Sequence, residues 1–193
     1  MPTVMPILSK DKQGKESEPM DSLRYPIGNF NPAKETSEEL IKNCITKIEN
    51  IPVSLKRAIE GLTVEQLDTP YRPEGWTVRQ VVHHIADSHI NAFVRFKLAL
   101  TEEKPTVKTY AEERWAELPD SKDAPVEISL SLVEAIHDRW IILLNSLALP
   151  DFKREFLHPD LGNVPLEITV QLYAWHGSHH IAQITSLRER MKW

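Results

Sequence analysis

Apolar side chains recur every three to four residues through four long stretches of this chain, the period of one face of an α-helix. The clearest stretch runs from Val78 to about Leu100, and Thr77 with Gln80 forms a capping box in front of it. No stretch of useful length alternates apolar and polar residues as a half-buried strand does. These patterns predict an all-α protein built as a four-helix bundle.

The first long helix is predicted over residues 36–61. Thr36 with Glu39 forms the capping box expected to open it, and apolar residues recur through the stretch that follows. Pro52 lies inside this stretch, where a proline removes a backbone donor and clashes with the preceding turn. We therefore expect Pro52 to kink this helix or to divide it.

The third and fourth helices have starts of their own. Ser131 with Glu134 forms a further capping box, expected to open a helix over residues 131–147. Pro165 suits the first turn of the last helix, predicted over Leu166–Met191. Prolines bracket the segment between these two helices, which is expected to be a loop.

A long polar segment, residues 101–129, connects the second and third helices. Residues 110–118 within it have the composition of a short helix. A connection of this length in a compact protein usually carries function or crosses the end of the bundle. The predicted architecture is thus a bundle with a long, partly helical connection between its second and third long helices.

Composition excludes several classes of protein. The single cysteine, Cys44, rules out an intrachain disulfide and zinc sites built from several thiolates. A net charge of −5 argues against nucleic acid or an anionic membrane as partner. Neither a signal peptide nor a spanning apolar stretch is visible, so we expect a cytoplasmic protein. Residues 1–20 are predicted to be a disordered polar tail, followed by one domain over 21–193.

Two histidines one helical turn apart lie on the apolar face of the last helix. His176 and His180 share that face with Leu172, Ile184 and Leu187. Each imidazole would bring two polar nitrogens into the core, which costs free energy unless both are satisfied. A divalent metal ion satisfies one nitrogen on each ring. We interpret the pair as metal ligands; the alternative is two core histidines that bond to neighbouring groups.

Two neighbours of this pair need separate interpretations. His179 lies beside the apolar face and is expected at its rim or on the surface. Gly177 lies inside the helix, where glycine costs roughly 1 kcal/mol relative to alanine. It indicates either the close approach of another segment or a glycine that is merely tolerated.

A third ligand must come from another helix, and the second long helix carries three histidines. His89 lies near the centre of the apolar stripe, where a core histidine is the simpler interpretation. His84 lies about 100° away, on a strip of polar residues that a helix lining a cavity would show. His83 lies further round. Spacing alone therefore leaves His84 and His89 both open.

His137 follows Glu134 in a Glu-x-x-His arrangement. Di-iron bundles use two such arrangements, and only one occurs here. His137 is therefore predicted to be structural, and Glu134 to serve in a capping box.

Three segments together resemble one known family. They are Tyr25-Pro26-Ile27-Gly28, the segment from Gly75 to His89, and the segment from Trp175 to Ile184. They resemble the YfiT-like metal-dependent hydrolases of the DinB-like superfamily, and the resemblance runs from about Leu23 to Trp193. It implies a DinB-like four-helix bundle, one divalent ion per subunit, with zinc preferred and nickel as the alternative, and a homodimer.

The resemblance also implies the third ligand. In this superfamily the ligand on the second helix is a histidine followed by an apolar and then a small residue, a pattern that falls on His84-Ile85-Ala86. The superfamily's C-terminal histidine pair falls on His176 and His180. The implied metal site is therefore His84, His176 and His180.

Three histidines on one divalent ion leave a coordination position open to water, whose pKa the metal lowers towards neutrality. The leading expectation is a metal-dependent hydrolase acting on a small molecule. Superfamily relatives of the bacillithiol type imply an alternative, a thiol S-transferase that activates a low-molecular-weight thiol. A bundle that binds metal or a small ligand without turnover is the second alternative.

No general base stands out in the sequence. The candidates are Asp87, Glu134 and the 101–129 segment. Partners that orient the ligand rings are expected among the polar residues near them, which are Gln80, Ser88, Asn91 and Gln183.

Overall fold

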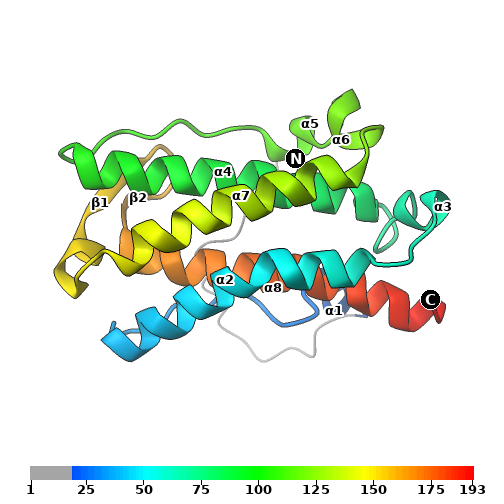
Figure 1. Ribbon diagram of the computed structural model, residues 1–193, viewed down its shortest axis with the longest axis horizontal. Helices are drawn as coiled ribbons and strands as arrows, with labels where there is room; N and C mark the ends of the chain where they lie inside the picture. The colour runs from blue at the N-terminus through cyan, green and yellow to red at the C-terminus, as the bar shows by residue number, and fades with distance from the viewer. Residues whose placement is uncertain (1–18) are drawn as a thin grey trace.

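The computed structural model describes residues 19–193. Four long helices form its body (Figure 1): α2 (Glu38–Ile59), α4 (Val78–Thr101), α7 (Val126–Asn145) and α8 (Leu166–Met191). The shorter elements are α1 (Pro19–Arg24), α3 (Val64–Leu67), α5 (Glu112–Trp115), α6 (Pro119–Lys122), the 3-10 helix η1 (Leu149–Lys153), β1 (Glu155–His158) and β2 (Gly162–Pro165). The predicted four-helix bundle is confirmed. Within residues 19–193, no helix is long and apolar enough to cross a membrane.

The order of the helices explains the long connection. α2 packs against α7 and α8, and α4 packs against the same two helices. In Figure 1, α4 and α7 run in the same direction, opposite to α2 and α8. The chain must therefore return along the whole bundle between α4 and α7, as residues 102–125 do. The expected connection is present, with α5 and α6 near its end.

Local capping explains where the helices begin. α4 starts as predicted, since the Thr77 backbone N–H donates to Oε1 of Gln80 at 2.9 Å and the Gln80 N–H donates to the Thr77 hydroxyl at 3.1 Å. α8 has the predicted bounds. The predicted capping residue of α2 was wrong by one position, because the hydroxyl of Ser37 rather than Thr36 accepts from the Leu40 N–H.

The predicted start of α7 was wrong. The helix begins at Val126, directly after Pro125, and Ser131 lies inside it with its hydroxyl donating to the Glu127 carbonyl. Val126 and Ser129 are buried, so the helix gains a further turn of contact with the core. Tertiary packing thus placed the start five residues earlier than the local capping pattern did.

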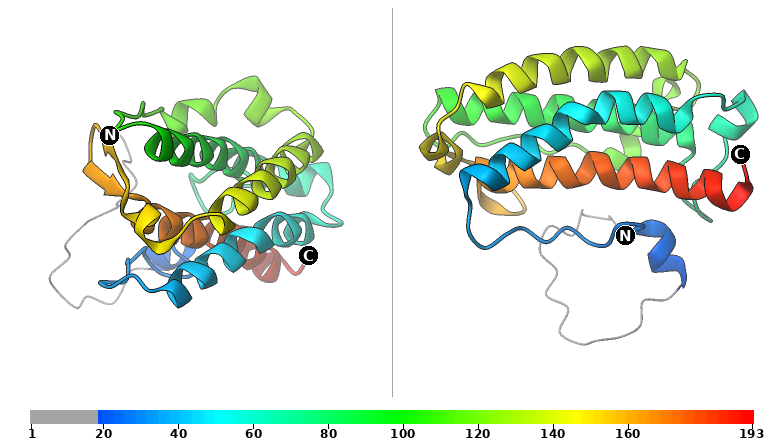
Figure 2. Two further views of the ribbon diagram at one scale, coloured as in Figure 1. Left: turned by 60° about the vertical axis from the view of Figure 1, so that its left-hand side comes forward. Right: turned by 60° about the horizontal axis from the view of Figure 1, so that its bottom comes forward.

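Pro52 does not divide α2, which continues as one helix from Glu38 to Ile59. The helix bends along its length, as Figure 2 shows. Since proline has no backbone N–H, the carbonyl of Ile48, four residues earlier, lacks its helical donor.

The segment between α7 and α8 differs from the loop that was expected. η1 leads into an antiparallel hairpin in which Phe156 pairs with Val164 and His158 with Gly162. Strands of four residues are too short to show a clear alternation in the sequence. Of the predicted polar tail, residues 1–18 lie outside the described part of the chain, and Pro19 and Met20 begin α1.

Gly177 marks the close approach of α8 to α2. A Cβ atom at this position would lie 2.7 Å from Cγ1 of Ile51 and would also overlap its Cδ1 atom. Ile51 is buried in the core, so its side chain would have to shift to make room for the added atom. The glycine is therefore required by packing, which decides between the two interpretations of it.

Gly177→Ala should destabilise the bundle by about 1–3 kcal/mol through overpacking, although alanine has the higher helix propensity. The free energy of unfolding in urea measures this loss. Ser178→Ala, one residue along α8, is the matched control and should change stability by only about 0.5 kcal/mol. Combining Gly177→Ala with Ile51→Ala should cost less than the sum of the two single changes, and simple additivity would contradict the proposed contact.

Candidate metal centre

Three buried histidines from two helices converge on one point. Nε2 of His84, from α4, lies 3.3 Å from Nε2 of His176, and Nε2 of His180 lies 3.2 Å from the same atom. One nitrogen from each ring lies within 4.8 Å of the other two. His176 and His180 are one turn apart on α8, so both rings reach the same side of that helix.

The spacing of these nitrogens fits a shared divalent ion. Ligand nitrogens about 2.0–2.1 Å from a tetrahedral ion lie about 3.3 Å from one another. Two of the three separations have this value. Three buried histidines so arranged could bind a metal.

Gln183 determines which nitrogen of His180 carries the proton. Its side-chain N–H₂ donates to the carbonyl of Arg24 at 2.9 Å, which directs Oε1 towards Nδ1 of His180 at 2.8 Å. Since that oxygen only accepts, Nδ1 must be the N–H and Nε2 keeps its lone pair. Of the polar residues expected near the ligand rings, Gln183 bonds directly to one of the converging histidines.

Burial keeps these rings neutral. It lowers the pKa of His84 and of His176 well below 6.5, and neighbouring histidines lower both further. The pKa of His180 falls to about 4 for the same main reason, burial. A neutral imidazole is the form that can bind a metal ion.

The other histidines have different places. His89 is fully buried behind His176, and its Nε2 lies 3.2 Å from Nδ1 of that ring. His83 points away, to the Ser129 hydroxyl at 2.7 Å and the Ala124 carbonyl at 3.2 Å. The tertiary structure thus brings His84, and not His89, to the converging nitrogens.

Two further histidines test the sequence interpretations. His137 is buried, bonds to the Ile48 carbonyl and is not one of the three converging histidines. The prediction for His179 was wrong: it is only 5% exposed. Its ring stacks on Trp175 at 4.5 Å, and its Nε2 accepts from Gln183 at 3.0 Å. The N-terminal segment covers the His179 side chain, and Tyr25 of that segment contacts the His179 ring.

The converging nitrogens face a cavity of about 430 Å³. Trp76 packs against His84 with ring centroids 4.6 Å apart and forms one wall. The segment around Tyr25 forms another, held by the bond from Nε1 of Trp175 to the Gly28 carbonyl at 3.3 Å. The Tyr25–Gly28 motif therefore belongs to the site, although the sequence offered no chemical reason for it. Arginines and glutamates complete the lining: Arg24, Arg72, Glu74, Glu112, Glu113 and Glu117.

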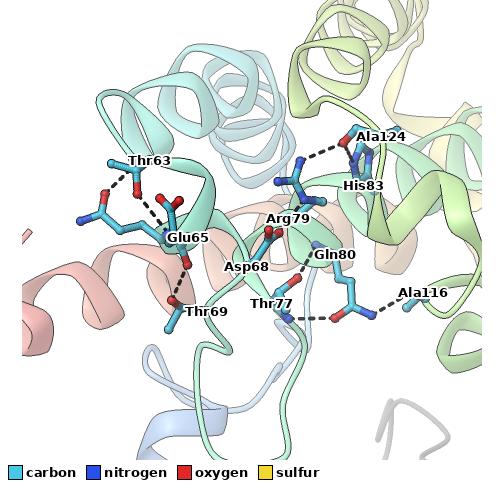
Figure 3. Close-up of polar contacts among 11 residues, drawn as sticks. Thr63, Glu65, Asp68, Thr69, Thr77, Arg79, Gln80, His83, Ala116 and Ala124 are labelled. Carbon is cyan, nitrogen blue, oxygen red and sulfur yellow. Dashed lines mark hydrogen bonds and ion pairs between the residues drawn. The ribbon is translucent and has the colours of Figure 1, made fainter.

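Figure 3 shows how Gln80 ties the long connection to α4. Its side chain accepts from the Thr77 backbone N–H and donates to the Ala116 carbonyl at 2.7 Å. On the next face of the helix, Arg79 and His83 both bond to the Ala124 carbonyl. The bond to Ala116, the residue that ends α5, holds α5 beside the cavity, so Gln80 bonds to the connection and to none of the converging histidines.

The other two polar candidates also bond elsewhere. The hydroxyl of Ser88 donates to the phenol of Tyr173 at 3.4 Å, and Asn91 donates to the Asp87 carbonyl within α4. Neither bonds to a converging histidine.

The connection supplies a carboxyl group to the cavity. Glu112, on α5, lines it together with His84, and burial and then the nearby Glu113 raise the pKa of Glu112 to about 7. Asp87 also has a raised pKa, about 6, but it lies outside the cavity lining. Glu134 is exposed on α7. Among the three bases considered from the sequence, only the connection reaches the site, and the sequence did not single out Glu112 within it.

Comparison with known proteins agrees with this arrangement. The profile of the DinB superfamily matches residues 48–184. Two relatives, from Bacillus cereus strain AH820 and Bacillus thuringiensis subsp. konkukian, are each 56% identical over 174 residues, which is 90% of this chain and 100% of theirs. Both bear the name "Putative metal-dependent hydrolase".

A solved structure is similar throughout the bundle. YfiT from Bacillus subtilis, described as a probable metal-dependent hydrolase with an unusual four-helix bundle topology, is 51% identical to this chain. The match has a TM-score of 0.87 and covers 89% of this chain and 99% of YfiT. The chain therefore belongs to the DinB superfamily, as a YfiT-like member.

Proposed function

We propose that this protein is a metal-dependent hydrolase of small molecules, with one divalent ion held by His84, His176 and His180. The supporting observation is the convergence of their Nε2 atoms, with separations of 3.2 and 3.3 Å, beside a cavity of about 430 Å³. A divalent ion so held would lower the pKa of water and polarise a carbonyl group. Imidazole ligands suit both zinc and nickel, and we propose zinc as the first candidate and nickel as the second.

The residues of the chain would supply the remaining functions. Glu112 lines the same cavity, and a carboxyl group with a pKa near 7 can take up and release a proton at neutral pH. Arg24 and Arg72 provide guanidinium groups that can bind an anionic part of the substrate. Trp76 and Tyr71 provide apolar walls that exclude water around the reacting group.

A comparison of metal-free protein with protein reloaded with zinc or nickel tests this proposal. A panel of esters and amides should be hydrolysed only by the loaded form, at a rate that does not depend on added thiol. Turnover that requires a low-molecular-weight thiol would favour the S-transferase instead. Equal rates with and without metal would contradict both the hydrolase and the S-transferase proposals, and would favour a bundle that binds metal or a small ligand without turnover.

Two further parts of the proposal concern the setting of the protein. We expect a homodimer, and sedimentation equilibrium would contradict this by giving the 22.2 kDa mass of one chain at micromolar concentration. We also expect the protein in the cytoplasm, where fractionation of cells should place it.

A further inference from the structure

We propose that His89 and His137 are positioning residues of this metal centre. Together with the Ile48 carbonyl they form a chain of hydrogen bonds that keeps the proton of His176 on Nδ1 and leaves the lone pair of Nε2 for the metal. This inference rests on the proposed metal site and goes beyond the three ligands.

The hydrogen-bond chain depends on Pro52. Because Pro52 has no backbone N–H, the carbonyl oxygen of Ile48 lacks the donor that the helix would normally provide. Nδ1 of His137, from α7, lies 2.8 Å from that oxygen. A carbonyl oxygen only accepts, so Nδ1 of His137 must carry a proton.

The position of the proton on each ring then determines its position on the next ring. Neutral His137 has its lone pair on Nε2, which lies 2.9 Å from Nδ1 of His89, so that nitrogen is an N–H. The lone pair of His89 is then on Nε2, 3.2 Å from Nδ1 of His176, which becomes the next N–H. Nε2 of His176 is left with a lone pair, 3.3 and 3.2 Å from those of His84 and His180.

The opposite order of protons does not fit the structure. It would place a bare nitrogen of His137 against the Ile48 oxygen, two acceptors 2.8 Å apart. It would also place a proton on Nε2 of His176, so that this nitrogen could not bind the proposed metal. The three rings of the chain are 0–1% exposed, so water cannot replace a missing donor.

Packing holds the rings in this order. His89 and His137 stack with centroids 5.0 Å apart and an angle of 18° between planes, and Trp140 packs edge-on against both. Burial lowers the pKa of His137 to about 4, so this ring stays neutral at pH 7. Orienting partners of metal-bound histidines typically contribute 10- to 100-fold in metal affinity.

His137→Leu tests the chain at its far end, since this residue contacts none of the three proposed ligands. We expect zinc affinity, measured by chelator competition, to fall about 10- to 100-fold. His137→Gln can again offer an acceptor to His89 and should recover part of the loss. His83→Leu is the matched control. His83 is a buried histidine of α4 that takes no part in the hydrogen-bond chain, so this substitution should change zinc affinity less than about 2-fold.

The spectrum of cobalt(II)-loaded protein should shift in His137→Leu and remain unchanged in His83→Leu. Equal zinc affinities for His137→Leu and His83→Leu would overturn the proposal. Should His137→Leu fail to fold, nitrogen-15 NMR of the unmodified chain decides, because a proton on Nε2 of His89 or His137 contradicts it. This measurement uses metal-free protein, so it remains informative even if the unmodified chain does not bind zinc and the proposed metal site itself is wrong.

Discussion

His84→Ala should lower zinc affinity about 100-fold or more while the bundle remains folded. A site with several protein ligands binds zinc with roughly 10–16 kcal/mol, so each ligand contributes a few kcal/mol. His84 is the only proposed ligand on α4, and its loss leaves the two histidines of α8. Chelator competition measures the affinity, and the metal content of purified protein should fall with it. Hydrolysis at limiting metal should decline in proportion.

The neighbour on the same helix provides the control. His83 is also buried, yet its ring nitrogens bond to the Ala124 carbonyl, just before α7, and to the Ser129 hydroxyl within α7. His83→Ala should therefore lower the free energy of unfolding and leave zinc affinity unchanged. If His84→Ala retained zinc as tightly as His83→Ala, the proposed ligand set would be wrong.

Glu112→Gln should reduce kcat by about 100- to 10,000-fold, the usual contribution of a general base. Glutamine keeps the size of the side chain but cannot accept the proton. Zinc affinity should stay unchanged, because Glu112 lines the cavity without belonging to the three converging ligands. Glu134→Gln, an exposed carboxyl on α7 that was also considered as a base, should leave kcat unchanged.

The pH dependence separates a lost base from a damaged fold. The base works in its ionised form, so kcat/KM should rise as pH increases through about 7, the pKa of Glu112, and the part of this rise that Glu112 contributes should vanish in Glu112→Gln. Loss of activity without any change in the pH profile would contradict the role of Glu112.

Stability should change in the opposite direction to activity. Burial raises the pKa of Glu112 from 4.5 to about 7, so folding favours its protonated form. Its stabilising contribution is complete below pH 4.5 and is lost as pH rises through about 7. At pH 8, Glu112→Gln should therefore have a higher Tm than the unmodified protein, and at pH 4 the two should be equal. A lower Tm at pH 8 would indicate structural damage instead.

The bounds of α4 and α8 could be predicted because their causes are local. A capping box precedes Val78, and Pro165 precedes Leu166, within a few residues of the helix each begins. The same reasoning failed for α7, where burial of Val126 outweighed the capping pattern at Ser131. The short hairpin was also missed, since its pairing joins residues whose sequence carries no clear strand period.

Helical period alone determined that His176 and His180 share one face, because residues four apart always do. It left His84 and His89 open, since His89 lies near the centre of the apolar stripe of α4 and His84 lies on the polar strip beside it, where a helix could line a cavity. The resemblance to the superfamily pattern at His84-Ile85-Ala86 implied His84. The packing of α4 against α8 places His84 at the converging nitrogens and His89 behind His176. This arrangement depends on how the two helices are rotated against each other, which helical period does not encode.

The hydrogen-bond chain behind His176 shows most clearly what the sequence determines and what only the tertiary structure determines. Pro52 was visible in the sequence, and its missing N–H could be read there. The donor that bonds to the Ile48 carbonyl could not be predicted from the sequence. Each long helix contributes one group to the series of hydrogen bonds: Ile48 from α2, His137 from α7, His89 from α4 and His176 from α8. Four residues far apart in sequence become hydrogen-bonded neighbours only when the bundle closes, so tertiary structure alone decided this order.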